Sequence, residues 1–155
     1  MERWLEAGVL KRPTSTWWDT RVHPALGTLE LRMPDQPTSP SVAAAFVALL
    51  HALALHAARG GLRAGSRADF QTNRFFASRF GTGAKLLHPE ADRLAGVPEL
   101  FGELRERLAD VIAEQGSADL VDVLDPTRCE AEQQLVAGPR EAAADLVRRT
   151  LESRR

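Results

Sequence analysis

Two short segments near the start of the chain alternate hydrophobic and polar residues with a period of two, which predicts a β-hairpin over residues 16–35. Successive side chains of a strand point to opposite faces, so each predicted strand has one mostly apolar and one mostly charged face. A four-residue loop over 24–27 fixes one register in which both faces match. The predicted cross-strand pairs are His23 with Thr28, Val22 with Leu29, Arg21 with Glu30, Thr20 with Leu31, Asp19 with Arg32 and Trp18 with Met33.

Apolar residues recur at helical spacing through most of the remaining chain. Ser39 followed by Pro40 is typical of a helix start, and Gly81 is typical of a helix end. The predicted helices run from Pro40 to Gly60, over 68–80, from Pro98 to Gly116, and over 118–124, 127–137 and 139–153. The third has an apolar stripe of Leu100, Leu104, Leu108, Val111 and Ile112, and the last is expected to turn Ala143, Leu146, Val147 and Leu151 inward.

These elements predict an α+β fold in which one antiparallel hairpin is followed by a mostly helical bundle. We expect a single domain over 1–155, with an initial helix or turn over 1–12, the hairpin over 16–35 and the helical region over 40–155. The sequence shows only one convincing hairpin. Because a two-stranded hairpin is marginally stable in water, its edges are expected to pair with further strands from elsewhere.

Composition is that of one ordinary globular domain: 155 residues, 44% hydrophobic and 26% charged. A net charge of -1 gives no electrostatic reason to expect nucleic-acid binding. The single Cys129 cannot form an internal disulfide and no secretion leader opens the chain, so we expect a cytoplasmic protein. The uncharged interval 41–58 falls short of a strongly apolar membrane span and contains His51 and His56, so we expect a helix of a soluble protein and no membrane association.

The charged face of the hairpin allows two interpretations. Opposite charges across an antiparallel pair stabilise it by roughly 0.2 to 1 kcal/mol each, so Arg21 with Glu30 and Asp19 with Arg32 can be ordinary surface pairs. The same face could also form a site for phosphate and a cation, because a carboxylate is a ligand for Mg²⁺ and an arginine neutralises phosphate. The spacing of these residues allows either.

Three motifs share their order and spacing with a known family: Trp17-Trp18-Asp19-x-Arg21-x-His23-Pro24, Gly27-Thr28-Leu29-Glu30-Leu31-Arg32-x-x-Asp35, and Asn73-x-x-x-Ala77-x-Arg79-x-Gly81. Together they resemble the carboxyl-terminal half of the type 2 glutamate-cysteine ligases, also called carboxylate-amine ligases. The resemblance extends over nearly the whole chain, and the Glu30-x-Arg32 strand is its most specific part.

This resemblance implies a glutamine-synthetase-like catalytic sheet and an ATP- and Mg²⁺-dependent ligase of glutathione biosynthesis. Members join the γ-carboxylate of glutamate to an amine, such as that of cysteine, through an acyl phosphate. The family's amino-terminal half, which carries further metal-binding carboxylates, has no counterpart here, so the chain alone is expected to show little activity. Carried over by motif, Glu30 is implied as a Mg²⁺ ligand, Arg32 and Arg21 as catalytic residues facing phosphate or substrate carboxylate, and His23, Asn73 and Arg79 as substrate or ATP contacts.

Two alternatives stay open at this point. Arg79 lies in the last turn of its predicted helix, where a cation interacts favourably with the helix dipole without any ligand. The whole chain could instead be a non-enzymatic interaction module, pairing with a partner through its hairpin edge and its leucine stripe. The amine substrate is not indicated by any residue of the sequence.

Overall fold

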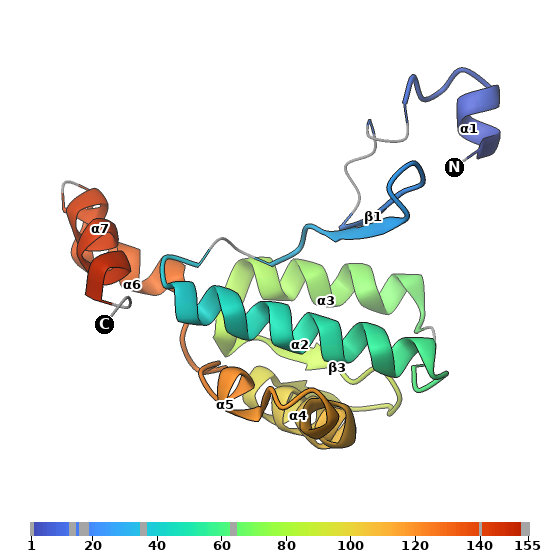
Figure 1. Ribbon diagram of the computed structural model, residues 1–155. Helices are drawn as coiled ribbons and strands as arrows, with labels where there is room; N and C mark the ends of the chain where they lie inside the picture. Colours follow the sequence, from blue (N-terminus) through green and yellow to red (C-terminus); the bar gives the residue numbers. More distant parts are fainter. Residues whose placement is uncertain are drawn as a thin grey trace. The chain divides into compact units, whose positions relative to one another are not determined.

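The computed structural model describes residues 2–12, 15, 19–34, 37–62, 65–139 and 141–152. The chain divides into two compact units, Met1–Gln36 and Pro37–Arg155 (Figure 1). Helices occur together with two small antiparallel sheets, so the predicted α+β class is confirmed.

The first unit contains a short helix, α1 (Glu2–Glu6), and a hairpin of strands β1 (Thr20–His23) and β2 (Thr28–Leu31). The predicted register is confirmed for all four residue pairs of these strands, from Thr20 with Leu31 to His23 with Thr28. The Arg32 N–H also donates to the Asp19 carbonyl oxygen at 2.8 Å, which continues the same register. Trp17, Trp18 and Asp35 were predicted to belong to the hairpin and its motifs, and these three residues lie outside the described ranges.

The turn of this hairpin covers residues 24–27, as predicted. The Leu26 N–H donates to the His23 carbonyl oxygen at 3.1 Å. Gly27 closes the turn with a φ of +63°, a conformation that glycine adopts without the steric cost of a Cβ atom. Local turn geometry and matched faces therefore act together to set the register.

Three helices form the core of the second unit: α2 (Pro40–Ala58), α4 (Val97–Glu114) and α5 (Ala118–Val121). Ser39 is the N-cap of α2 with Pro40 in its first turn, as predicted. Small alanines on α2 let the helices approach closely, and α4 contributes three residues of its predicted stripe. The core cluster consists of Ala48, Leu49, Ala52, Leu108, Val111, Ile112 and Val121.

A second hairpin, of β3 (Lys85–Leu87) and β4 (Leu94–Gly96), follows α3 (Arg67–Phe80) and a 3-10 turn, η2 (Gly81–Gly83). The prediction of a single hairpin was therefore wrong. Strands of three residues are too short to show an alternating pattern, and this pair is anchored instead by tertiary contacts: Ala84 and Ala95 are buried, and α3 packs against β3.

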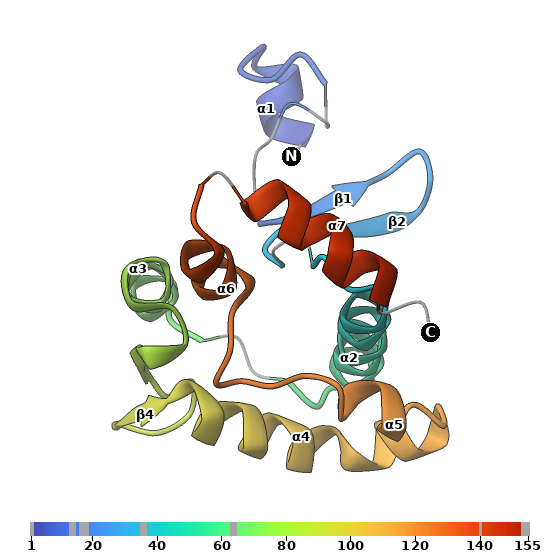
Figure 2. The same ribbon diagram turned by 90° about the vertical axis from the view of Figure 1, so that its left-hand side faces the viewer.

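The chain ends with α6 (Glu130–Ala137) and α7 (Ala142–Glu152), which lie beside the start of α2 (Figures 1 and 2). The inward face predicted for the last helix was wrong in part. Leu146 is half-buried, but Val147 and Leu151 are 60% and 56% exposed, and Ala143 is exposed as well. Charged and polar residues on the opposite side of α7 make its contacts with the rest of the unit.

One described helix, α2, is long and apolar enough to cross a membrane, with a mean hydropathy of 1.9. This property depends on length and composition alone, and the core helix of a soluble protein has it too. Ala48, Leu49 and Ala52 of α2 pack into the core described above. Only 22% of the apolar stretch of α2 is buried, so its packing against α4 and α5 covers part of its surface.

Candidate functional site

The charged face of the first hairpin brings Arg21, Glu30 and Arg32 together. Arg21 Nε donates to Glu30 Oε2 at 2.8 Å, and its Nη2 contacts the same oxygen. Arg32 directly follows β2, two residues after Glu30, and places Nη1 3.6 Å from Glu30 Oε1. One carboxylate thus lies between two guanidinium groups.

Exposure differs among these three side chains. Arg21 is 15% exposed, Arg32 28% and Glu30 43%, so the carboxylate is the most accessible group of the three. The Arg21–Glu30 contact confirms the cross-strand ion pair that the sequence predicted for the charged face. An ion pair with one half-exposed partner stabilises the folded state by about 0 to 1 kcal/mol. This small gain in stability does not by itself explain why three charged side chains gather here.

His23 lies at the end of β1 on the same face as Arg21. Its Nδ1 atom is buried and has no hydrogen-bond partner among the described residues. A buried polar atom without a partner costs roughly 1 to 3 kcal/mol, which is unusual in a stable structure. This atom has almost no accessible surface, so the contact of His23 with substrate or ATP stays a prediction.

The residues of this face fit a magnesium–phosphate group in part. Mg²⁺ is usually held by one or two carboxylates together with phosphate oxygens and water, and Glu30 can supply one such carboxylate, whose Oε1 lies 3.6 Å from Arg32 Nη1. The planar guanidinium groups of Arg21 and Arg32 suit phosphate oxygens, although the carboxylates of Asp19 and Glu30 on the same hairpin balance their charge. Within the described ranges, no three His, Cys, Asp or Glu side chains are grouped to hold a metal, so Glu30 would be a single protein ligand.

Asn73 lies in the second unit, on α3, and both polar atoms of its amide contact Leu87 in β3. Its Nδ2 donates to the Leu87 carbonyl oxygen at 2.8 Å, and its Oδ1 accepts the Leu87 N–H at 2.7 Å. The side chain thus satisfies two main-chain groups of a short strand. Through these two hydrogen bonds Asn73 holds the second hairpin against α3. The predicted contact of Asn73 with substrate or ATP stays a prediction.

Replacing Asn73 with alanine is expected to destabilise the second unit by about 1 to 3 kcal/mol, because both main-chain groups of Leu87 lose their partner. Hydrogen exchange should accelerate at the Leu87 amide. The matched control is Ser78→Ala, because Ser78 is exposed and its hydroxyl donates to the Arg74 carbonyl oxygen within α3. Unchanged protection of Leu87 would contradict the anchoring role.

Arg79 is exposed in the last turn of α3, and its guanidinium carbon lies 5.7 Å from the centre of the Phe80 ring. This cation–π contact and the helix dipole both favour the arginine at this position without a ligand. Gly81 ends the helix with a φ of +55°, as the predicted C-cap. The six predicted site residues therefore divide between the units: Arg21, His23, Glu30 and Arg32 in the first, Asn73 and Arg79 in the second.

A polar cluster at the second hairpin was not anticipated from the sequence. His88 Nε2 lies 2.7 Å from Glu103 Oε2, and His88 Nδ1 accepts the Glu90 N–H at 3.1 Å. The hydrogen bond from His88, together with Arg93, lowers the pKa of Glu103 from its ordinary value. Residues 65, 66, 69 and 87–92 line a neighbouring groove of about 500 Å³. No sequence signal marks these partners, since His88 and Glu103 lie fifteen residues apart.

Comparison with known proteins defines the class: the chain is similar to ligases of the glutamate-cysteine type. It belongs to the glutamate-cysteine ligase family 2, whose model matches residues 1–151, so the resemblance found in the sequence is confirmed. A Rubrobacter xylanophilus relative, provisionally named glutamate–cysteine ligase 2-3, is 37% identical over 83% of this chain and 35% of its own length. A Herpetosiphon aurantiacus relative, provisionally named glutamate–cysteine ligase 2, is 34% identical over 88% of this chain and 39% of its own.

A third relative, named glutamate–cysteine ligase, from Haloquadratum walsbyi, is 30% identical over 76% of this chain and 35% of its own length. The chain thus spans 35% to 39% of the length of these three relatives.

Proposed function

We propose that this chain forms part of an ATP-dependent carboxylate-amine ligase of the cytoplasm. The reaction joins the γ-carboxylate of glutamate, or a related carboxylate, to the amine of cysteine, or a related amine. Membership of the glutamate-cysteine ligase family 2 supports the ligase class. The arrangement of Glu30 between Arg21 and Arg32 is the observation that supports phosphate chemistry on this hairpin.

The proposed roles follow from the charges on the hairpin face. Arg32 and Arg21 bind phosphate or carboxylate oxygens through their planar guanidinium groups, and Glu30 is the one described ligand for Mg²⁺. When bound, Mg²⁺ neutralises phosphate charge. His23, with its buried Nδ1, contacts a polar group of the substrate or of ATP. Asn73 keeps the second hairpin in place, and Arg79 is proposed as a further contact for substrate or ATP.

The chemistry proposed has two steps. A carboxylate oxygen of glutamate bonds to the γ-phosphorus of ATP while the bond to ADP breaks, which gives an acyl phosphate. The amine nitrogen then bonds to the carbonyl carbon, phosphate leaves, and the nitrogen gives up a proton. Both steps build negative charge on phosphate oxygens, so the task of Arg21 and Arg32 is to position and neutralise them.

A complete ligase needs more than this chain, since the relatives are much longer. On the apolar face of the hairpin, Val22 and Leu29 are 53% and 54% exposed. We expect the purified chain to produce no γ-glutamyl product. Mixed with the amino-terminal part of the Rubrobacter relative, it should bind ATP in a Mg²⁺-dependent manner.

Equilibrium dialysis with labelled ATP, with and without Mg²⁺, tests this expectation, and phosphate release with glutamate and cysteine tests the reaction. Glu30→Gln in the same mixture should lose the Mg²⁺ dependence. The matched control, Glu99→Gln, removes a carboxylate exposed on α4 and should change nothing. Ligation by the chain alone, or partner binding without any nucleotide dependence, would contradict the proposal, and the latter result would favour the interaction module.

A further inference from the structure

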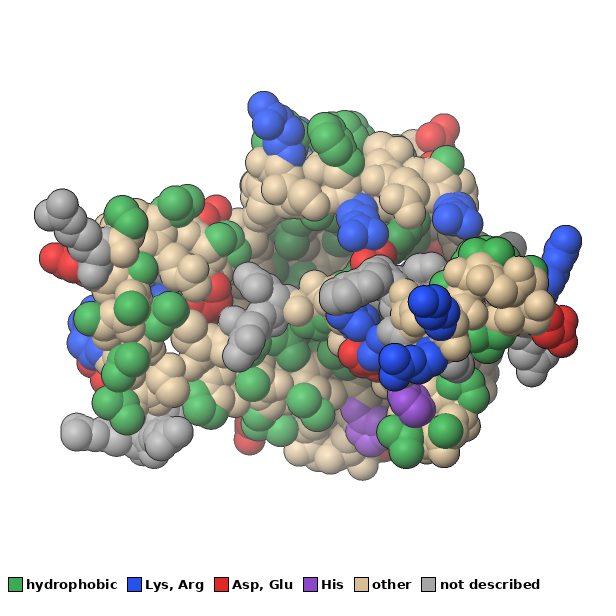
Figure 3. Space-filling view, turned by 90° about the horizontal axis from the view of Figure 1, so that it is seen from above, with side chains coloured by type: hydrophobic (Ala, Val, Ile, Leu, Met, Phe, Trp, Pro, Cys, Tyr) green, Lys and Arg blue, Asp and Glu red, His purple; other side chains and the backbone are tan. Residues whose placement is uncertain are grey.

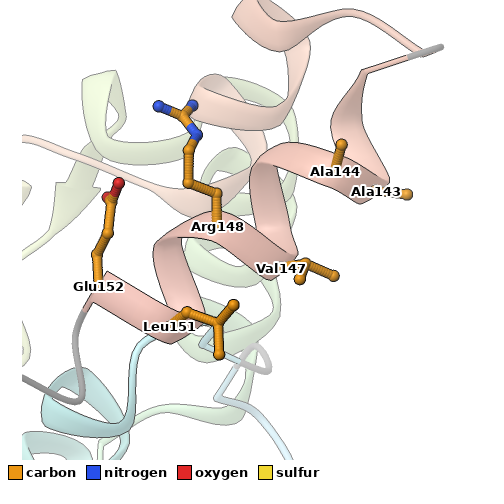
Figure 4. Close-up of a pocket in the computed structure, with 6 residues that line it drawn as sticks. All are labelled: Ala143, Ala144, Val147, Arg148, Leu151 and Glu152. Carbon is orange, nitrogen blue, oxygen red and sulfur yellow. The ribbon is translucent and has the colours of Figure 1, made fainter.

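Hydrogen bonds and ion pairs orient two parts of the second unit. Helix α7 is one of them: Thr150 Oγ1 donates to the Thr38 carbonyl oxygen at 2.8 Å, while Val147 and Leu151 point outward (Figure 4). Hydrophobic side chains accordingly gather on the surface of the α6–α7 pair, at the left of Figure 3. The other part is the turn between β3 and β4, residues 88–93, which begins with a histidine. Because histidine is the side chain that ordinarily changes charge between about pH 5 and 8, this turn can respond to pH.

His88 directly follows β3 and uses both of its ring nitrogens. Nδ1 accepts the Glu90 N–H at 3.1 Å, and Nε2 lies 2.7 Å from Glu103 Oε2. A main-chain N–H can only donate, so Nδ1 carries no proton, and the proton of the neutral ring is on Nε2, which donates to Glu103. The His88 side chain is 10% exposed, so these two partners define its surroundings. They select one neutral tautomer of this histidine.

Helix α4 holds both ends of this turn. Glu103 pairs with Arg93 at the end of the turn as well as with His88 at its start. Arg107 donates two hydrogen bonds to the Glu90 carboxylate, at 2.8 and 2.6 Å. The hydrogen bond from His88, followed by that from Arg93, lowers the pKa of Glu103. This carboxylate therefore stays ionised over the pH range in which a histidine changes charge, and it loses its charge only in more acidic solution.

The charged side chains that are linked to His88 or line the same groove come from three elements. Helix α4 contributes Glu99, Glu103 and Arg107, the turn contributes Glu90, Asp92 and Arg93, and α3 contributes Asp69. Among these groups carboxylates outnumber guanidinium groups, so a positive charge on the His88 ring is electrostatically tolerated. The ring can therefore take up a second proton without leaving its place beside Glu103.

We propose that the 88–93 turn is a pH-sensitive switch, in which protonation of His88 at Nδ1 breaks its bond with the Glu90 N–H while the Nε2 bond to Glu103 stays. A protonated Nδ1 is a donor that faces a second donor at 3.1 Å, so the Glu90 main chain has to move away. Glu90 is exposed, so its N–H then bonds to water. Residues 88–92 line the groove of about 500 Å³, whose shape therefore changes with pH. This switch does not depend on the ligase activity.

NMR of the ¹⁵N-labelled 155-residue chain, titrated from about pH 8 to about pH 5, tests the proposal. At the alkaline end, the His88 ring should carry a proton on Nε2 and none on Nδ1. As the ring takes up its second proton, protection of the Glu90 amide from hydrogen exchange should fall by about three- to tenfold, after correction for the intrinsic pH dependence of exchange. The Leu87 amide, which donates to Asn73 Oδ1, is the internal reference and should keep its protection.

His88→Asn makes the test specific for the histidine. The asparagine carbonyl oxygen can accept the N–H two residues ahead, as is common in turns, and it has no charge to gain. Protection of the Glu90 amide in this variant should be equal at both ends of the pH range. The matched control is His51→Asn, at an exposed histidine of α2, which should keep the pH dependence of the unmodified chain.

Circular dichroism checks that both variants keep the helix content of the unmodified chain. Three results would each overturn the proposal: a proton on His88 Nδ1 at the alkaline end, a Glu90 amide whose protection does not follow the ring titration, or a pH dependence that persists in His88→Asn. The first two results come from the unmodified chain and need no variant.

Discussion

Leu108→Ala is expected to lower the free energy of unfolding of the second unit by about 2 to 5 kcal/mol. Leu108 is fully buried at the centre of α4 and packs in one cluster with residues of α2 and α5. Alanine removes these contacts and leaves a cavity that rigid helices fill only in part. Urea unfolding followed by circular dichroism measures the loss.

The matched control for this substitution is Leu135→Ala. Leu135 is 80% exposed on α6, so its truncation should change the free energy of unfolding by less than about 0.5 kcal/mol. Equal effects of the two alanine substitutions would mean that the core does not lie between α2, α4 and α5.

Arg32→Lys, in the ligase assembled with the amino-terminal part of a relative, is expected to lower kcat by about 100-fold or more. Lysine keeps the charge but loses the planar, two-point contact that a guanidinium group makes with phosphate. The side chain is partly exposed and lysine keeps its charge, so thermal stability should change little. Steady-state kinetics and a thermal melt of the same preparation separate the two effects.

Arg59→Lys is the matched control for Arg32→Lys. Arg59 also pairs with a glutamate, Glu114, but it lies at the end of α2 with more than half of its side chain exposed. Its replacement should leave kcat unchanged. If Arg32→Lys retains full activity at equal folding, Arg32 has no role in neutralising phosphate.

The first hairpin could be predicted in detail because its information is local. Matched faces and a four-residue turn ending in Gly27 specify one register, and the structure has it. The start of α2 at Pro40 and the C-cap at Gly81 are likewise encoded by residues next to the helix end. The family motifs lie on these same local elements, so membership could also be inferred from them.

The second hairpin and the face of α7 could not be predicted in the same way. Strands β3 and β4 depend on Asn73, which lies fourteen residues before its partner Leu87. The outward turn of α7 depends on Thr38, more than a hundred residues from Thr150. An apolar stripe predicts that one face of a helix packs against another surface. It does not indicate whether that surface belongs to the same chain or to another molecule.

The sequence by itself determined the hairpin register, the positions of most helices and the ligase family, because periodicity, capping residues and motif spacing are properties of neighbouring residues. Only the tertiary structure decided that Asn73 holds β3 and that α7 turns its charged side inward. Each of these depends on which distant groups satisfy a buried hydrogen bond or charge. That pairing is settled by packing in three dimensions and leaves no regular pattern along the chain.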